Sequence, residues 1–214
     1  VAKNGMVATE QALASRIGLQ VLQAGGNAVD AAVAVGFALA VALPNAGNIG
    51  GGRFKLVHEA ASGHRVALDF RETAPASAQR SMYLDAQGQV IDGKSLYTHH
   101  AVGVPGTVAG LTHALQQWGT LPLAHVLQPA IDLAEQGYPV STTLAQALER
   151  AQTTMGRWPA TQAIFWKNGE PLKVGDPLVQ KDLAQSMRLI AQQGAKAFYE
   201  GEIAQKIAAE MAPH

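Results

Sequence analysis

The sequence predicts a mixed α/β protein whose sheet is incomplete within this chain. The stretch from Ala31 to Leu43 is apolar on every face, and a helix of that kind lies inside a layered fold, between a sheet and another layer. One pair of strands, within residues 54–70, precedes a long series of helical patterns. Because a lone hairpin is marginal without partner strands, we expect the chain to be one part of a larger fold.

The composition is that of a globular protein with a sizeable core. The chain has 214 residues, 48% of them hydrophobic, and we expect residues 1–214 to form a portion of a single domain. Its 16 basic and 16 acidic residues are mixed along the chain, which argues against nucleic acid as a partner. The absence of cysteine excludes a disulfide framework and a Cys nucleophile in this piece. Its longest apolar stretch is short for a bilayer, so no membrane span is expected, and no export signal is evident.

Two helices with local start and stop signals open the chain. Thr9 is placed to cap the first, which ends at Gly25–Gly26. Its apolar residues recur at helical spacing: Leu13, Ile17, Val21 and Leu22. Asn27 can cap the second helix, with Asp30 in its first turn, where the helix dipole favours a negative charge. Pro44 ends that helix.

A β-hairpin follows a glycine-rich segment. Residues 45–52 contain too many glycines for regular structure, and residues 54–58 suit a strand. Ala61–Gly63 predicts the turn, after which apolar residues alternate up to Phe70. Arg71 therefore lies just past the end of the returning strand.

The rest of the chain is mostly helical. We interpret residues 72–100 as a long excursion with little regular structure. A short strand is expected at Ile164–Trp166, before a turn at Asn168–Gly169. The predicted helices lie within residues 105–118, 121–136, 141–153, 181–193 and 202–211.

Most candidate chemical motifs have simpler explanations. The glycines of residues 45–52 match neither a dinucleotide-binding loop nor a phosphate-binding loop, and we expect them to let backbones pass closely. No Gly-x-Ser-x-Gly elbow occurs, which argues against a serine hydrolase. No metal site is predicted, because the histidines are scattered without zinc-ligand spacing. They are His58, His64, His99, His100, His113, His125 and His214.

Arg71 is the strongest candidate for contact with a ligand. Its planar guanidinium can hold a carboxylate through two parallel hydrogen bonds, and the end of a strand is a common place for a ligand. Asp69 and Glu72 flank it, so local pairing with these carboxylates explains the arginine equally well. The residues alone leave both interpretations open.

Ordered blocks of sequence resemble the gamma-glutamyltransferase family, in its bacterial form, over nearly the whole chain. The blocks are GMVAT (5–9), GGNAVDAAVAV (25–35), NAGNIGGG (45–52), LDFRETAPA (68–76), GVPGTVAG (103–110), LQPAIDLAEQGYPV (127–140), AIFWKNGEPLKVGDPLVQ (163–180) and AFYEGEIAQKIAAEM (197–211). The resemblance implies an N-terminal-nucleophile hydrolase, a four-layer αββα sandwich made by autocatalytic cleavage of a precursor zymogen into a large and a small subunit. This chain then corresponds to the N-terminal portion of the large subunit, and the small subunit of the same heterodimer completes the sheet.

The same resemblance implies a division of roles. The nucleophile is the threonine at the N-terminus of the small subunit, so no catalytic residue is expected in this chain, and Arg71 binds the α-carboxylate of the gamma-glutamyl donor. Donors such as glutathione or glutamine form a gamma-glutamyl ester that passes to water or to amino-acid and peptide acceptors. No cofactor is implied, and the location is periplasmic or secreted.

Other functions on the same fold stay open. They are a glutaryl or cephalosporin acylase and a poly-gamma-glutamate depolymerase, and a noncatalytic fragment is the alternative of another class. One departure from the family pattern concerns the glycine-rich loop, where Arg53 and Lys55 replace a glycine and a methionine. If that glycine serves positive φ or close backbone approach, arginine costs stability. The chain also stops at Ala212–His214, short of the expected end of a large subunit.

Overall fold

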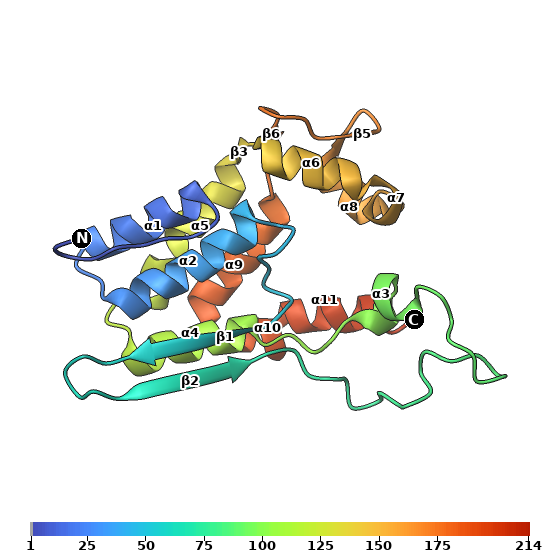
Figure 1. Cartoon of the computed structure of the whole chain (residues 1–214), viewed down its shortest axis with the longest axis horizontal. Helices are drawn as coiled ribbons and strands as arrows, with labels where there is room; N and C mark the ends of the chain where they lie inside the picture. Colours follow the sequence, from blue (N-terminus) through green and yellow to red (C-terminus); the bar gives the residue numbers. More distant parts are fainter. Residues whose placement is uncertain (1) are drawn as a thin grey trace. The chain divides into compact units, whose positions relative to one another are not determined.

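The structure is a computed structural model that describes residues 2–214 (Figure 1). The chain divides into two compact units. The first contains residues up to Asn48 together with Leu111–Gly194, and the second contains Ile49–Gly110 and Ala195–His214. That residues 1–214 form a portion of one domain stays a prediction.

The first unit is built around helices. The larger ones are α1 (Ala12–Gln23), α2 (Ala28–Ala42), the part of α4 (Thr107–Trp118) from Leu111 onward, α5 (Leu123–Gln136) and α9 (Lys181–Gln193). α2 packs against α1 and α5, and α5 packs against α9. Helix α2 buries 10 of its 15 residues, among them Phe37 and Val41, which is the interior position that its apolar sequence predicts.

The start of α2 has the predicted cap. The Asn27 side-chain oxygen accepts hydrogen bonds from the backbone N–H groups of Val29 (2.8 Å) and Asp30 (3.0 Å), and the Asp30 carboxylate accepts from the Asn27 N–H (2.7 Å). The helix ends at Ala42, before Pro44, as expected.

The predicted cap of α1 is wrong by two residues. Gln11 is the capping residue, and its side-chain oxygen accepts from the backbone N–H of Leu13. The Thr9 hydroxyl instead donates to the carbonyl oxygen of Gln11 at 2.7 Å and accepts from the Gln11 N–H. The Thr9 side chain therefore forms a local turn before the helix, and the first helical turn starts later.

The buried Asp30 also fastens the loop after α4. Its carboxylate accepts from the Thr120 N–H (2.8 Å), the Thr120 hydroxyl (2.6 Å) and the Leu121 N–H (3.1 Å), while the Asn27 side-chain amide donates to the Trp118 carbonyl (2.6 Å). Burial alone would raise the pKa of Asp30, but the Thr120 hydroxyl and the backbone N–H groups outweigh burial and lower it. Asp30 is therefore a buried carboxylate that stays ionised near neutral pH.

The smaller elements of this unit lie within residues 138–178. They are β3 (Tyr138–Pro139), α6 (Thr142–Arg150), α7 (Gln152–Met155), α8 (Pro159–Phe165), β4 (Trp166–Lys167), β5 (Glu170–Pro171) and β6 (Pro177–Leu178), with β3 paired to β6 and β4 to β5. Within the helical stretch predicted for residues 141–153, Ser141 caps α6, because its side-chain oxygen accepts a hydrogen bond from the backbone N–H of Leu144. The predicted short strand at Ile164–Trp166 is confirmed only at Trp166, because Ile164 belongs to α8 and the strand begins at Trp166. The predicted turn at Asn168–Gly169 is confirmed between β4 and β5. Pro159 at the start of α8 has a backbone preorganised for a helix, which extends through the apolar residues that suggested a strand.

The second unit holds the predicted hairpin. Strand β1 (Arg53–His58) pairs antiparallel with β2 (Arg65–Phe70), with Arg53 opposite Phe70. After the hairpin comes the expected long excursion, which contains only α3 (Lys94–Tyr97) and a 3₁₀ turn at His99–Ala101 up to the start of α4. Helices α10 (Lys196–Tyr199) and α11 (Glu202–Met211) complete the unit.

One face of the hairpin is open to solvent within this chain. Val57 and Phe70 are buried on the inner face, whereas Phe54 is 64% and Leu56 83% exposed on the other face. The outer face of the hairpin therefore presents two neighbouring apolar side chains to solvent. Among the described residues, no helix is long and apolar enough to cross a membrane.

Candidate substrate-binding site

Arg71, the predicted carboxylate-binding residue, directly follows β2. Its backbone N–H donates to the Asp69 side chain at 3.1 Å, which turns the chain at the strand end. Just beyond it, Thr73 and Val104 exchange two backbone hydrogen bonds of 3.2 and 2.8 Å. Arg71 therefore lies on backbone that is held on both sides.

Two glycine-containing segments enclose this strand end. The backbone N–H groups of Gly106 and Thr107 both donate to the Gly51 carbonyl at 2.8 Å. A methyl group at Gly52 would lie 2.5 Å from the carbonyl oxygen of Phe70, and one at Gly106 would collide with the same oxygen. The expectation that the glycine-rich loop lets backbones pass closely is thus confirmed at Gly52.

The Arg71 side chain is oriented on one edge and open on the other. Its side chain is 61% exposed, its Nε donates to the Glu72 carboxylate at 3.1 Å, and its guanidinium carbon lies 5.8 Å from the centre of the Phe54 ring. Within residues 2–214 the two terminal nitrogens make no hydrogen bond. Local pairing with Glu72 therefore occupies only Nε. The two terminal nitrogens, the outer fork of the guanidinium, can donate two parallel hydrogen bonds to a carboxylate.

The partner carboxylate is held in its charged form. The backbone N–H of Glu72 itself is the main cause that lowers the pKa of its carboxyl, and the Arg71 side chain and the Gly52 N–H lower it further against the opposing effect of burial. Glu72 is therefore ionised at neutral pH and can orient Arg71.

Arg53 and Lys55, which depart from the family pattern, lie on the hairpin face that points away from the Arg71 guanidinium and Phe54. Their side chains share the face of Phe70, whereas Phe54, beside the Arg71 guanidinium, is on the opposite face. The backbone of Arg53 is not at positive φ, so the strain considered for an arginine in place of glycine does not arise from that source. Burial lowers the pKa of the Arg53 guanidinium, and the amino nitrogen of Lys55 is buried as well.

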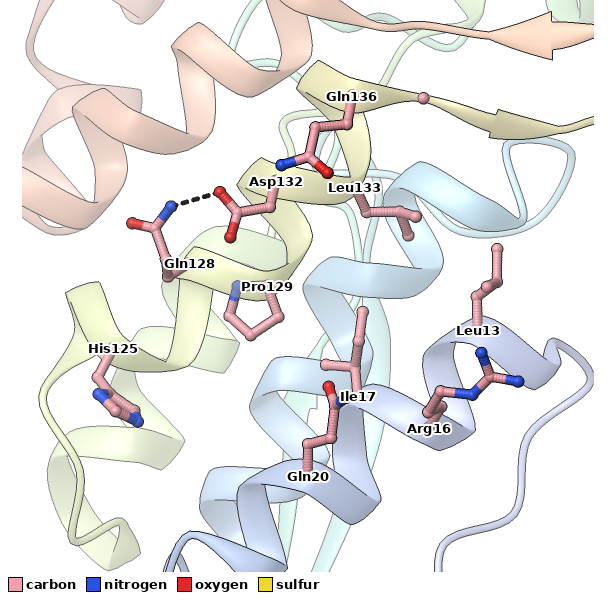
Figure 2. A pocket seen from close by; sticks show the side chains of 11 residues that line it. Leu13, Arg16, Ile17, Gln20, His125, Gln128, Pro129, Asp132, Leu133 and Gln136 are labelled. Atoms are coloured by element: carbon pink, nitrogen blue, oxygen red, sulfur yellow. Dashed lines mark hydrogen bonds between the residues drawn. The ribbon is translucent and has the colours of Figure 1, made fainter.

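A separate groove of about 490 Å³ lies along α1 and α5 in the first unit (Figure 2). Arg16 and Gln20 line it from α1, and Gln128 and Asp132 from α5, where the Gln128 amide donates to the Asp132 carboxylate at 2.7 Å. Neither spacing nor composition indicated this groove, because its walls come from helices far apart in the sequence. Arg71 does not line it.

The sequence pattern of gamma-glutamyltranspeptidases matches residues 14–214 of this chain. The match spans almost all of the described residues and decides the family. The chain belongs to the gamma-glutamyltranspeptidase family.

Individual relatives agree with this assignment. The chain is 52% identical over 211 residues to a protein named glutathione hydrolase proenzyme from Escherichia coli (strain K12), which covers 98% of this chain and 36% of that protein. The chain thus spans about a third of the length of this relative.

Two solved structures show the fold class of the chain. The structure of the Helicobacter pylori gamma-glutamyltranspeptidase superimposes with a TM-score of 0.97 at 46% identity, covering 100% of this chain and 61% of that one. A cephalosporin acylase from Bacillus halodurans superimposes with a TM-score of 0.88 at 37% identity, covering 97% of this chain and 39% of that one. The fold class is therefore that of the N-terminal-nucleophile hydrolases, of which this mixed helical and β chain forms a part.

Proposed function

We propose that this chain is the large-subunit part of a gamma-glutamyltransferase that cleaves gamma-glutamyl amides such as glutathione. The single observation that carries the proposal is the geometry of Arg71 within the LDFRETAPA block, a guanidinium held at Nε with its outer fork open. A free amino-acid carboxylate is the ligand that such a fork matches best.

In this proposal Arg71 positions the substrate and takes no part in bond cleavage. The α-carboxylate of the donor binds the two terminal nitrogens, while Glu72 keeps the guanidinium from rotating about its long side chain. A glutamyl unit fixed at that end has few positions for its γ-carbonyl, and this restriction lowers the entropic barrier to attack. The glycine contacts at Gly52 and Gly106 keep the backbone of Arg71 in place.

The attacking group belongs to a partner subunit of the same precursor. In the proposal an N-terminal threonine of that subunit attacks the γ-carbonyl, forms a gamma-glutamyl ester and releases the amine, and water or an amino-acid or peptide amine then resolves the ester. The exposed hairpin face at Phe54 and Leu56 supports a partner chain at this edge. A periplasmic or secreted location, with no cofactor, completes the proposal.

Replacing Arg71 tests the assignment in the intact two-subunit enzyme. We expect Arg71→Ala to weaken donor binding by about 2–5 kcal/mol, the usual cost of truncating one member of a charge pair that substrate buries, while the acceptor KM is unchanged. Arg71→Lys should recover only part of this loss, because lysine cannot form the bidentate pair. The matched control is Arg65→Ala, an exposed arginine at the other end of β2. Unchanged donor kinetics in Arg71→Ala would remove Arg71 from the site.

A second candidate function is favoured by the likeness to the cephalosporin acylase. Glutaryl and gamma-glutamyl groups share a terminal carboxylate position, but only the gamma-glutamyl group carries an α-amino group. Comparing hydrolysis of gamma-glutamyl and glutaryl anilides separates the two functions, since faster turnover of the glutaryl compound identifies an acylase. A noncatalytic fragment is rejected if a second chain that begins with threonine accompanies this one.

A further inference from the structure

The second unit brings together two histidines and a carboxylate that are far apart in the sequence. His99 lies in the 3₁₀ turn, Glu210 in the last turn of α11, and His214 just after that helix. The His99 ring nitrogen Nε2 is 3.2 Å from the Glu210 carboxylate, across 111 positions of sequence. The rings of His99 and His214 stack at 3.6 Å with their planes 7° apart.

These three side chains have the spacing of a cation site. One ligand atom from each lies within 4.8 Å of the other two. Ligand atoms around a tetrahedral zinc ion with bonds of about 2.0–2.1 Å are about 3.3 Å apart, so the ligand atoms must approach one another by about an ångström. Because a bound metal ion lies in the plane of each imidazole, the His214 ring must also turn out of its parallel stack with the His99 ring. Glu210, 74% exposed, and the exposed His214 can move that far, whereas His99 is only 19% exposed and sets the position.

The donor set specifies the class of ion. Two imidazole nitrogens and one carboxylate oxygen suit Zn²⁺ and the neighbouring divalent transition metals, whereas Mg²⁺ and Ca²⁺ prefer oxygen ligands throughout. His99 and His214 also line a cavity of about 600 Å³ whose wall includes Val102, Val104 and Met211. Three protein ligands beside a cavity leave a fourth position for water or a small ligand.

We propose that His99, Glu210 and His214 bind a divalent transition-metal ion such as Zn²⁺. The ion ties the 3₁₀ turn to the end of α11. Three residues after that turn, Val104 forms its two backbone hydrogen bonds with Thr73. Occupancy therefore stiffens backbone that leads directly to the strand end carrying Arg71, whether or not Arg71 binds a donor.

Calorimetric titration with ZnCl₂ tests this site in the intact protein that contains the chain, prepared without a histidine tag and stripped with a chelator. We expect one Zn²⁺ per chain, and affinity reduced at least about tenfold in each of the variants His99→Gln, Glu210→Gln and His214→Gln. Mg²⁺ in excess should not displace the zinc.

His64→Gln is the matched control. His64 is an exposed histidine in the same unit, 3.9 Å from the Glu59 carboxylate, and it offers a histidine–carboxylate pair without a third ligand. Its replacement should leave zinc affinity unchanged. The proposal is overturned if the protein takes up no zinc with saturation, if the three ligand variants bind it as the wild type does, or if only His64→Gln loses affinity. Glu210→Gln keeps the size of an exposed side chain, so a loss there is not attributable to misfolding.

Discussion

Replacing Asp30 by asparagine probes the polar cluster that joins α2 to the loop after α4. Asp30 is 0% exposed and accepts four hydrogen bonds, from the N–H of Asn27, the N–H and hydroxyl of Thr120, and the N–H of Leu121. An amide has one acceptor oxygen, so its NH₂ group must face the pair of donors on one side of the cluster. In the less costly orientation the NH₂ group faces the Thr120 hydroxyl and the Asn27 N–H. The hydroxyl can rotate and accept a hydrogen bond from the NH₂ group, whereas the Asn27 N–H can only donate.

That orientation loses a charge-assisted bond and leaves a buried N–H without an acceptor. A hydrogen bond to a charged group contributes about 1.5–3 kcal/mol to stability, and an unsatisfied buried donor costs about 1–3 kcal/mol. The two values overlap, because both include the loss of the same bond. We therefore expect Asp30→Asn to lower the free energy of unfolding by about 2–4 kcal/mol. Asp85→Asn is the control, because Asp85 also accepts backbone N–H bonds, from Gln87 and Gln89, but in an exposed turn. Its cost should stay below about 1 kcal/mol.

The measurements are the thermal unfolding midpoint and hydrogen exchange of the Thr120 and Leu121 amides. Because the pKa of Asp30 is lower in the folded protein than in the unfolded chain, its stabilising effect is complete above pH of about 4 and is lost as pH falls through the folded pKa. The difference between wild type and Asp30→Asn should therefore shrink in acid. A wild-type midpoint with unchanged exchange at both amides, or a difference that does not depend on pH, would refute the reasoning.

Two further substitutions test close packing and shared hydrogen bonding. Gly52→Ala places a methyl group 2.5 Å from the Phe70 carbonyl and should raise the donor KM and lower the unfolding midpoint, whereas Gly50→Ala, with no atom within 4 Å of the added group, should change neither. The Tyr138 hydroxyl and the Gln180 amide both donate to the Val41 carbonyl, at 2.8 and 2.9 Å. Tyr138→Phe should therefore lower the free energy of unfolding by about 1 kcal/mol in a denaturant titration. The double variant Tyr138→Phe with Gln180→Leu should lose more than the sum of the two single variants, because only the double variant leaves the Val41 carbonyl unpaired. Strictly additive losses would contradict this expectation.

Features that depend on interactions between sequence neighbours can be predicted from the sequence, whereas features that depend on contacts between distant residues cannot. Asn27, Pro44 and Gly137 act on their own neighbours, and the helix boundaries next to them were predicted within two residues. The predictions at Thr9 and Ile164 are wrong because two local structures compete at each position. The Thr9 hydroxyl bonds either to a helical N–H or to a nearer turn, and the apolar residues near Ile164 suit a strand or a helix until Pro159 favours the helix.

The candidate site shows the same limit over longer distances. A motif singled out Arg71, but nothing local states that Glu72 occupies its Nε, that Phe54 lies 5.8 Å away, or that its terminal nitrogens are open within the described chain. His99 and His214 lacked metal-ligand spacing in the sequence, and only the fold of the second unit brings them together.

The glycine motifs connect these observations. Gly52 and Gly106 belong to two blocks more than 50 positions apart, yet both exclude a side chain for the same reason, the carbonyl oxygen of Phe70. In the proposed role of Arg71, the backbone of this residue must not shift, because a bidentate pair with a carboxylate tolerates little movement. The glycines let the neighbouring backbone close on that strand end, with Gly51 accepting two N–H bonds from residues 106 and 107. The rigid backbone at Arg71 thus depends on glycines, which have no side chain. Their substitution should weaken donor binding because it displaces the Arg71 guanidinium.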